Sequence, residues 1–355
     1  MTSSPIVILS GARTPIGKLS GSLASMSAVQ LGGIAIGAAL DKAGLAGDQI
    51  DYVYMGHVLQ AGAGQITARQ AAVNGGIPMS VPATTVNKVC LSGMDAIYQA
   101  DRRIRSGDAD IVVAGGMESM TNAPHLLPGA RSGYRIGDGV LVDSMMYDGL
   151  YCAFDECAMG EGTEKYAQAH GLIREHMDAM AAESHRRADA AQQGGLFADE
   201  IVAVTIPQRR GDALVVGHDE GVRGETTIES LAGLRPAFDK QGHITAGNAS
   251  QISDGASAMV ITTAEVAERL GATPLAEIIG FGQVAGPDAS LLHQPSRAIK
   301  AALDRAGLSV GDVDLFEINE AFAAVGVASA DDLGISMDVV NVNGGAIAVG
   351  HPLGM

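Results

Sequence analysis

Residues 35–51 read AIGAALDKAGLAGDQID, and residues 298–314 read AIKAALDRAGLSVGDVD. Aligned without gaps, ten of the seventeen positions in these two stretches are identical. Each stretch has the pattern of a helix that ends at a glycine, followed by a turn and the approach to a strand. A chance match of helix-forming residues is the alternative, but the shared Asp-x-Ala-Gly-Leu and the closing Asp favour a duplication. Two similar halves packed together would account for a length of 355 residues, which is more than one core usually holds.

Strand-like and helix-like stretches alternate outward from the first copy. Four short apolar runs are typical of buried strands, at residues 5–9, 52–55, 83–86 and 110–114. Helical patterns lie at residues 28–43, 68–74 and 92–106, and each is followed by a glycine. This alternation predicts an α/β protein built in layers. Between residues 122 and 245 the pattern changes to turn-rich sequence and a charged helical run, which we interpret as an insertion into the first half.

The charge of the chain limits its partners. The net charge is −17, and an acidic surface repels the phosphate backbone of nucleic acids, so nucleic acid is not an expected partner. A phosphorylated small molecule needs only a few local cations, which residues 165–240 could supply. The arginines of that segment include Arg186, Arg187, Arg209, Arg210 and Arg223. From charge alone, an ordinary mixed surface is an equally good interpretation of these arginines.

Neither a signal peptide nor a membrane span is expected from the sequence. The first residues lack a basic segment followed by a long apolar run, and no stretch approaches the roughly 20 apolar residues that a span requires. Three cysteines are few for a secreted chain, so a reducing cytoplasm is the expected location.

Cys90 stands between an expected strand and an expected helix, in the stretch NKVCLSG (residues 87–93). Backbone amides at a helix N-terminus stabilise anions, so this position is expected to favour the thiolate, which is the nucleophilic form of cysteine. A buried inert cysteine is the alternative. Cys152 and Cys157 have no matching His or Cys pair at zinc spacing, so no metal site is expected. Other histidines are interpreted as solvated helix positions, among them His170, His176 and His185.

His351 lies between a glycine and a proline in NGGAIAVGHPLG (residues 343–354). A histidine on a constrained turn suits a base whose position is fixed, and an imidazole that titrates near neutrality can accept a thiol proton. A structural histidine in a turn is the alternative. Asn319, in EINEAFAA (residues 317–324), could hold a water or a carbonyl oxygen just after an expected strand at residues 315–318.

Together these motifs resemble those of the thiolases. Six stretches occur in the order of that family, namely GARTPIGK, NKVCLSG, GGMESM, TAGNASQISDGA, NEAFA and NVNGGAIAVGHPLG. The resemblance covers essentially the whole chain and implies a five-layered αβαβα fold built from two similar halves. It implies a first half at residues 1–121, completed by residues 246–272. It also implies an inserted loop domain for coenzyme A binding and tetramerisation at residues 122–245, and a second half at residues 273–355.

The resemblance further implies acyl transfer between coenzyme A thioesters, with no resident cofactor. Cys90 would attack the acyl-CoA carbonyl and carry the acyl group as a thioester. His351 would deprotonate Cys90 and help bind the thioester oxygen, and Asn319 would hold a water that completes this oxyanion hole. The backbone N–H of Cys90 would contribute to a second hole for the tetrahedral intermediate.

Five further positions match family residues that contact the substrate. Arg223, Ser230 and Ser250 match coenzyme A contacts, while Met159 and Leu150 match residues at the acyl and pantetheine end. Many biosynthetic thiolases have His-Met-Gly where this chain has Ala158, Met159 and Gly160, which leaves a longer or branched 3-ketoacyl substrate open. The family continues beyond GHPLG with a Cys-x-Gly-Gly-Gly motif that supplies a second catalytic cysteine. This sequence ends at Met355, so a shortened second half is expected.

Acetyl-CoA C-acetyltransferase activity in lipid and fatty acid metabolism is the leading interpretation. The alternatives are a longer-chain or branched 3-ketoacyl-CoA thiolase of degradation, a carrier-protein-dependent condensing enzyme, and an inactive thiolase-like lipid-binding protein. The coenzyme A segment counts against the condensing enzyme, and the retained Cys90, Asn319 and His351 count against the inactive protein. Residues 121–145 resemble the tetramerisation region, so a homodimer or homotetramer is expected. Acyl-CoA and coenzyme A are the expected small-molecule partners, with no membrane partner.

Overall fold

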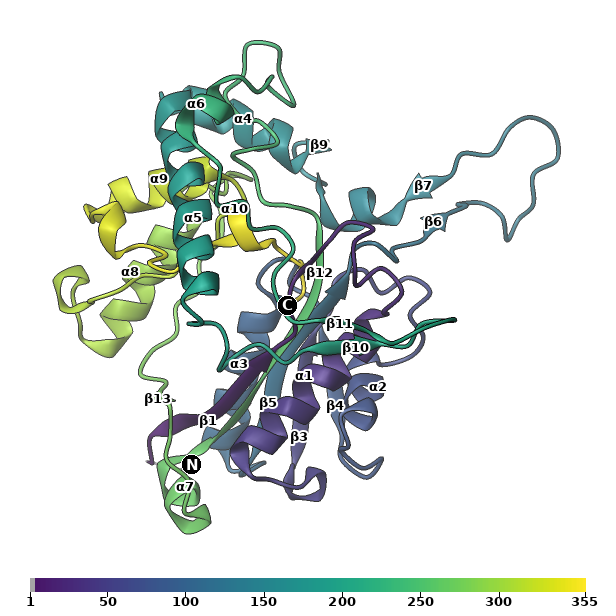
Figure 1. Cartoon of the computed structure of the whole chain (residues 1–355), viewed down its shortest axis with the longest axis vertical. Coiled ribbons are helices and arrows are strands. Elements are labelled where there is room, and N and C mark those ends of the chain that lie inside the picture. Colours follow the sequence, from purple (N-terminus) through teal and green to yellow (C-terminus); the bar gives the residue numbers. More distant parts are fainter. Residues whose placement is uncertain (1–3) are drawn as a thin grey trace.

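The computed structural model describes residues 4–355, and one mixed sheet forms the centre of its lower part (Figure 1). The strand order is β13–β1–β12–β5–β3–β4, and β2 pairs with β12 beside this path. Strands β3 and β4 run parallel to β5, whereas β12 is antiparallel to both of its neighbours, β1 and β5. The strand bounds are β1 Ile6–Arg13, β2 Gly17–Lys18, β3 Tyr52–Gly56, β4 Ala83–Val86, β5 Val112–Ser119, β12 Ser253–Thr263 and β13 Ala276–Glu277. Residues far apart in the chain therefore meet at the centre of this sheet.

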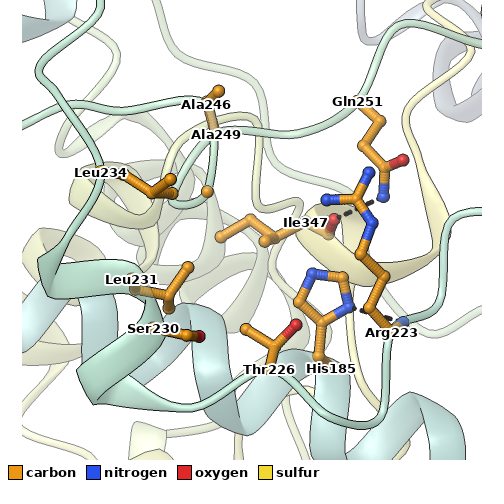
Figure 2. Close-up of a pocket in the computed structure, with 11 residues that line it drawn as sticks. His185, Arg223, Thr226, Ser230, Leu231, Leu234, Ala246, Ala249, Gln251 and Ile347 are labelled. Atoms are coloured by element: carbon orange, nitrogen blue, oxygen red, sulfur yellow. Dashed lines mark hydrogen bonds between the residues drawn. The ribbon is translucent and has the colours of Figure 1, made fainter.

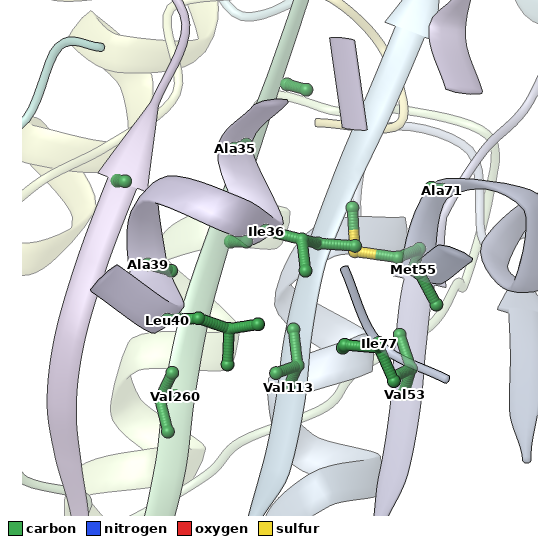
Figure 3. Close-up of a cluster of buried hydrophobic side chains, with 14 of the residues drawn as sticks. Ala35, Ile36, Ala39, Leu40, Val53, Met55, Ala71, Ile77, Val113 and Val260 are labelled. Atoms are coloured by element: carbon green, nitrogen blue, oxygen red, sulfur yellow. The ribbon is translucent and has the colours of Figure 1, made fainter. Parts of the chain in front are cut away.

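Helices cover both faces of the sheet. Helices α1 (Ala28–Ala43) and α2 (Thr67–Asn74) pack on one face, where Ile36 and Leu40 contact Val53, Val113 and Val260 (Figure 3). Helix α3 (Ser92–Ser106) packs on the other face through a separate cluster that includes Tyr54 and Val112. Neighbouring residues of β3 and β5 thus alternate between the two faces, and both faces are buried, as in sheets sandwiched between helices.

The repeated sequence has the same local structure in both copies. Helix α1 ends at Gly44 (φ 66°) and helix α8 (Gln294–Ala306) ends at Gly307 (φ 71°), both in the left-handed conformation that favours glycine. The residue after each glycine donates its N–H back into the last helical turn, and a 3₁₀ helix follows, at Gly47–Gln49 and Val310–Asp312. The two copies therefore share their helix ends and the turns that follow.

A second, mainly helical body lies against the end of the sheet (Figure 1). Its long helix α5 (Arg174–Gln193) packs against α9 (Ala323–Leu333), α10 (Ala346–Val349) and α6 (Ile228–Ala232). Helix α4 (Met159–Ala169) joins the same cluster of buried side chains, and α7 (Ala264–Leu270) follows β12. Three short antiparallel ribbons complete the fold: β6 His125–Leu126 with β7 Val142–Asp143, β8 Tyr151–Cys152 with β9 Cys157–Ala158, and β10 Val204–Ile206 with β11 Leu214–Val216.

The predicted mixed α/β fold is confirmed, and the second half, which was expected to be incomplete, forms no sheet of its own within the described residues 273–355. Among the described residues 273–355, β13 pairs with β1 of the first sheet, and residues 315–318 form no strand. Only an isolated bridge joins Phe316 to Val340. A strand needs a neighbour to pair its backbone N–H and C=O groups, and this stretch has no such neighbour beyond the bridge. The boundaries expected at residues 121, 245 and 272 remain predictions.

No helix within residues 4–355 is long and apolar enough to cross a membrane.

Candidate active site

Cys90 occupies a tight turn between β4 and α3. The preceding Val89 has a φ of 49°, in the sparsely populated left-handed region, so the turn is held by its surroundings. Ser92 does much of this holding, since it accepts a hydrogen bond from the N–H of Lys88 (2.8 Å) and donates to the carbonyl of Val89 (2.6 Å). Cys90 is exposed at the surface, at the N-terminal end of α3. Cys90 therefore lies between a strand and a helix, as predicted.

The predicted thiolate at Cys90 is wrong for the free protein. The protein atoms around its thiol limit solvation of the thiolate and raise the pKa to about 11, although the residue still has exposed surface. The carboxylate of Glu118 raises the pKa further, while the backbone N–H of Cys90 itself lowers it. Burial and the charge of Glu118 thus both oppose ionisation of the thiol.

His351 and Asn319 lie together, although they are on different elements. The Nδ2 of Asn319 is 3.3 Å from the Nε2 of His351, so Nε2 serves as the acceptor and the ring proton belongs on Nδ1. Burial lowers the pKa of His351 to about 4. The expectation that this imidazole titrates near neutrality is therefore wrong, and a neutral ring faces Asn319 at physiological pH.

Close backbone packing brings the end of the chain to the start of α3. A Cβ atom added at Gly93 would collide with the carbonyl of Met355, and one added at Gly56 or Gly116 would collide with the carbonyl of Gly354. Three glycines from three elements therefore leave room for the backbone that follows His351. The same packing places residues 354–355 against the first turn of α3, which begins two residues after Cys90.

Two buried glutamates at this site were not predicted as functional. Glu118 lies on β5, where all eight residues are buried, and Glu320 follows Asn319 directly. Burial raises the pKa of Glu118 to about 7, and it also raises the pKa of Glu320. The sequence offered no local signal for Glu118, because the strand expected at residues 110–114 ends before it.

A cavity of about 290 Å³ lies between α5, α6 and the loop leading into β12 (Figure 2). Arg223 and Ser230, both predicted to contact coenzyme A, line this cavity. Ser250 lies between two lining residues, Ala249 and Gln251, but does not itself line the cavity. The other lining residues are His185, Thr226, Leu231, Leu234, Ala246, Gly247 and Ile347.

The cavity connects to the segment that carries His351. The side-chain amide of Gln251 donates to the carbonyls of Ile347 (3.2 Å) and Ala348 (3.1 Å), and the carbonyl of Gln251 accepts from the N–H of His351 (3.4 Å). Gln251 therefore joins the wall of the cavity to the backbone on which the histidine stands.

Met159 and Leu150 lie together but away from this cavity. The N–H of Met159 donates to the carbonyl of Leu150 (2.9 Å), and Leu150 packs beside a small cluster that contains Leu353. Neither residue lines the cavity of Arg223 and Ser230. The five predicted substrate contacts thus fall into two groups, one at the cavity and one beside the segment after His351.

The interpretation of His185 as a solvated helix position is wrong. His170 and His176 are exposed as expected, but His185 is buried and lines the cavity. Its Nδ1 accepts a hydrogen bond from the N–H of Arg223 (3.2 Å), and burial, with the charge of Arg223, lowers its pKa to about 4. Its spacing from the buried Ala181 and Ala188 on the same helix was the signal that sequence reasoning missed.

Within residues 4–355, no group of three or more His, Cys, Asp and Glu side chains is placed to hold a metal ion.

Two family models match the chain. Residues 6–265 match the N-terminal domain of thiolase, and residues 272–355 match the C-terminal domain of thiolase. A probable acetyl-CoA acetyltransferase of Mycobacterium leprae is 58% identical over 355 residues, which cover 100% of this chain and 90% of that protein. A probable acetyl-CoA acetyltransferase of Mycolicibacterium smegmatis is 56% identical over 98% of this chain and 90% of its own length. The acetyl-CoA acetyltransferase of Cupriavidus necator is 50% identical over 98% of this chain and 89% of its own length.

Proposed function

Because this chain belongs to the thiolase family, we propose that it is an acetyl-CoA C-acetyltransferase that carries the acetyl group as a thioester on Cys90. One observation carries the proposal. A neutral His351, held by Asn319, stands on a segment whose end packs against the first turn of α3, which begins two residues after Cys90. Relatives named acetyl-CoA acetyltransferase support the choice of acetyl as the transferred group.

The first half-reaction begins with an uncharged thiol and an uncharged imidazole. As the Sγ of Cys90 attacks the carbonyl carbon of acetyl-CoA, His351 accepts the thiol proton. The new C–S bond forms, the C–S bond to coenzyme A breaks, and the proton then passes to the departing thiolate of coenzyme A. Because burial raises the pKa of Cys90 and lowers the pKa of His351, we place the proton transfer in the same step as the attack.

The oxygen of the reacting carbonyl needs hydrogen-bond donors as charge develops on it. The backbone N–H of Cys90, at the N-terminal end of α3, serves the tetrahedral intermediate. Asn319 holds a water that donates to the thioester oxygen, and the Nε2 of His351 becomes a second donor while it carries the thiol proton. The cavity lined by Arg223 and Ser230 takes coenzyme A, with Ser250 beside its wall. The reaction then needs no resident cofactor.

A longer or branched 3-ketoacyl-CoA is the second candidate substrate, and one residue favours it. The small Ala158 stands directly before Met159 at the start of α4, where many biosynthetic thiolases have a histidine. A smaller side chain beside Met159 and Leu150 leaves more room at the acyl end. Thiolysis of 3-ketoacyl-CoA substrates of increasing chain length distinguishes the two, since acetyl specificity predicts a sharp fall after acetoacetyl-CoA.

The test of the proposed function is covalent labelling. The protein is incubated with acetyl-CoA and its intact mass is measured, followed by peptide mapping of the labelled site. We expect one acetyl group on Cys90, none on the Cys90→Ala variant, and a slower reaction in His351→Ala. An unlabelled native protein would reject the proposal and favour an inactive, thiolase-like lipid-binding protein.

The remaining parts of the proposal concern the setting of the enzyme. A cytoplasmic enzyme of lipid and fatty acid metabolism is consistent with its sparse cysteines and with the acyl-CoA substrates. Assembly as a homotetramer, with a homodimer as the alternative, rests on the long connection between β6 and β7 (Figure 1). This connection carries exposed apolar residues. Those residues include Leu127, Ile136, Val140 and Leu141.

A further inference from the structure

The backbone around His351 is held at both ends by buried carboxylates. We call residues 347–354 the His351 segment. The N–H of Ile347, at its beginning, donates to Glu320 (3.0 Å), and the N–H of Gly354, at its end, donates to Glu118 (2.9 Å). Glu118 is 0% exposed and Glu320 is 1% exposed. The two glutamates come from different halves of the chain, so the segment is fastened between the halves.

Glu118 joins three parts of the protein at one point. Its Oε2 accepts hydrogen bonds from the N–H groups of Gly354 and Val58 (3.0 Å), and its Oε1 accepts from the N–H of Leu59 (3.1 Å). The Nε2 of His57 lies 3.3 Å from the same Oε1. Both carboxylate oxygens of Glu118 therefore accept hydrogen bonds. The carboxylate is on β5, and its backbone donors follow β3 and His351.

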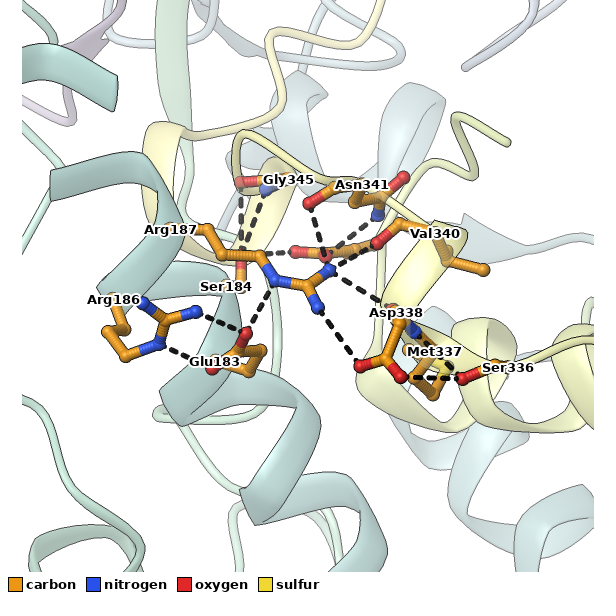
Figure 4. Close-up of polar contacts among 11 residues, drawn as sticks. Glu183, Ser184, Arg186, Arg187, Ser336, Met337, Asp338, Val340, Asn341 and Gly345 are labelled. Atoms are coloured by element: carbon orange, nitrogen blue, oxygen red, sulfur yellow. Dashed lines mark hydrogen bonds and ion pairs between the residues drawn. The ribbon is translucent and has the colours of Figure 1, made fainter. Parts of the chain in front are cut away.

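Glu320 makes an equivalent set of contacts on the other side. Its carboxylate accepts from the N–H of Ile347, from the hydroxyl of Ser184 (2.6 Å) and from the side-chain amide of Asn341 (2.8 Å). Figure 4 shows Ser184 also bonded to Gly345, just before the segment begins. Glu320 follows Asn319 in the chain, so one short stretch supplies both the amide partner of His351 and the anchor for its backbone.

These contacts are difficult to explain as stabilising features alone. Transfer of a carboxylate from water to a buried site is unfavourable, and well-packed apolar residues of similar size often serve stability as well or better. Burial raises the pKa of Glu118 and of Glu320, which reflects this unfavourable transfer. A carboxylate, unlike an apolar side chain, supplies a fixed acceptor for backbone N–H groups.

We propose that Glu118 and Glu320 are positioning residues for the acylation of Cys90, acting through His351 by fixing the two ends of its segment. This inference rests on the proposed function. It predicts that loss of either carboxylate slows proton transfer to His351. For Glu118, which contacts no residue of the cavity wall, the cavity around Arg223 and Ser230 should keep its shape.

Glu118→Gln and Glu320→Gln test the proposal. The glutamine amide keeps the size of the side chain but replaces one acceptor oxygen with an NH₂ group, which then faces backbone N–H donors. We expect the acylation rate at saturating acetyl-CoA to fall about 100-fold in each variant, because misplacement of a catalytic group by about 1 Å has an effect of that order. For Glu118→Gln we expect the KM for acetyl-CoA to change less than about threefold.

Repeating both substitutions in the His351→Ala variant distinguishes an effect on the position of His351 from a general loss of stability. In His351→Ala, the residual acylation rate no longer depends on where the histidine stands, so Glu118→Gln and Glu320→Gln should lower it less than about threefold. An equal 100-fold fall in both backgrounds would overturn the proposal, because the glutamates would then act independently of His351. An unchanged rate in the single variants would overturn it as well.

Glu164→Gln is the matched control. Glu164 is 2% exposed and accepts hydrogen bonds from the N–H groups of His243 (2.8 Å) and Ile244 (2.7 Å), neither of which belongs to the His351 segment. Its replacement should lower the melting temperature as the other two do, but change the saturated acylation rate less than about threefold. A fall as large as that of Glu118→Gln would assign the effect to the loss of any buried carboxylate and overturn the proposal.

A milder variant keeps the test valid if a glutamine variant does not fold. Ser184→Ala removes the 2.6 Å hydrogen bond to Glu320 and leaves the carboxylate in place. We expect a smaller fall in acylation rate in the wild-type background and none in His351→Ala; equal falls in both would contradict the proposal. If the wild-type protein is not acylated at all, the proposed function fails, whereas a wild-type protein that is acylated no faster than Glu118→Gln overturns this inference alone.

Discussion

At the scale of single residues, the candidate catalytic pair rests in its uncharged form. The thiol of Cys90 and the imidazole of His351 have pKa values displaced away from each other, near 11 and near 4. Both displacements follow from burial, which disfavours whichever form carries charge. The sequence pointed to both residues as candidates, and the family resemblance implied that they act together. The sequence could not predict their protonation, because Glu118 and the surrounding backbone reach the site from distant parts of the chain.

The first prediction concerns the reactivity of Cys90. Since only the thiolate reacts with iodoacetamide, the alkylation rate of Cys90 should rise about tenfold per pH unit from pH 7 to about 9.5. Peptide mapping after short exposures measures this rate at Cys90 alone, and free glutathione in the same tubes provides the reference. A rate that levels off below pH 8 would mean that the pKa is not raised.

The second prediction concerns the stability that His185 contributes. Its folded pKa of about 4 lies below its ordinary value, so between pH 6.5 and 4 the unfolded chain binds a proton that the folded protein does not. Acidification through this window should therefore favour unfolding, by up to about 3 kcal/mol from this group. Arg223 and Glu225 are the charged groups that act on it.

The matched variant for this prediction is His185→Gln, which keeps an acceptor for the N–H of Arg223 but cannot be protonated. Urea unfolding at pH 7 and at pH 4.5 should show a larger loss of free energy of unfolding in the wild type, by about 2 to 3 kcal/mol. Equal losses in the two proteins would show that His185 keeps its ordinary pKa.

At the scale of elements, glycines determine how closely the backbone can approach the start of α3. Gly93 is the second residue of that helix, and its missing side chain is what lets the carbonyl of Met355 lie against it. Gly37, inside α1, has only ordinary contacts with Gly75, the nearest atom lying 3.6 Å from an added Cβ. The two positions are both helical, but only the first is needed for the geometry of the site.

The third prediction compares these two glycines. Gly93→Ala should destabilise the protein by about 1 to 3 kcal/mol, the usual range for overpacking, and should slow acylation of Cys90 because residues 354–355 must move. Gly37→Ala should be neutral or stabilise by up to about 1 kcal/mol, since alanine is the better helix former. Thermal melts and acetyl-CoA labelling measure both effects. A stable, fully active Gly93→Ala protein would contradict this account of the site.

Elements were predictable where local signals and burial agree. Helix α1 was expected at residues 28–43 and occupies Ala28–Ala43, because Ser27 caps its start and Gly44 its end. Strand β5 was expected at residues 110–114 but runs from Val112 to Ser119. Its second part, GGMES, lacks the apolar side chains of a typical buried strand. The pairing of Gly115 with Ala258 and of Glu118 with Gly255 on β12 extends the strand, and no local pattern reveals partners so distant.

At the scale of the whole molecule, the site forms where two bodies meet. Cys90 belongs to the body built on the sheet, whereas Asn319 belongs to the helical body and His351 follows its last helix. The family resemblance predicted that these residues act together. The sequence alone could not show what holds them, since Glu118 and Glu320 bind backbone N–H groups, which leave no trace in residue type.

The fourth prediction concerns assembly. The connection between β6 and β7 projects from the rest of the chain (Figure 1), and Ile136 and Val140 on it are 100% and 73% exposed. If this connection binds other subunits, Ile136→Asp with Val140→Asp should reduce the mass measured by light scattering from that of a tetramer to that of a dimer. Val215→Asp, at a 62% exposed position on β11, is the control and should leave the mass unchanged. A monomeric wild-type protein would contradict the proposed assembly.

The central position of β12 has a consequence for how the protein is made. Strands β1, β3, β4 and β5 have all been synthesised once Ser119 is added, but β1 and β5 are joined only through β12, which begins at Ser253. At roughly 5–20 residues per second, synthesis of the intervening chain takes on the order of ten seconds. During that time the buried edge of β5 has no partner, and unpaired strand edges promote aggregation. We therefore expect chaperones to bind the nascent chain during this interval.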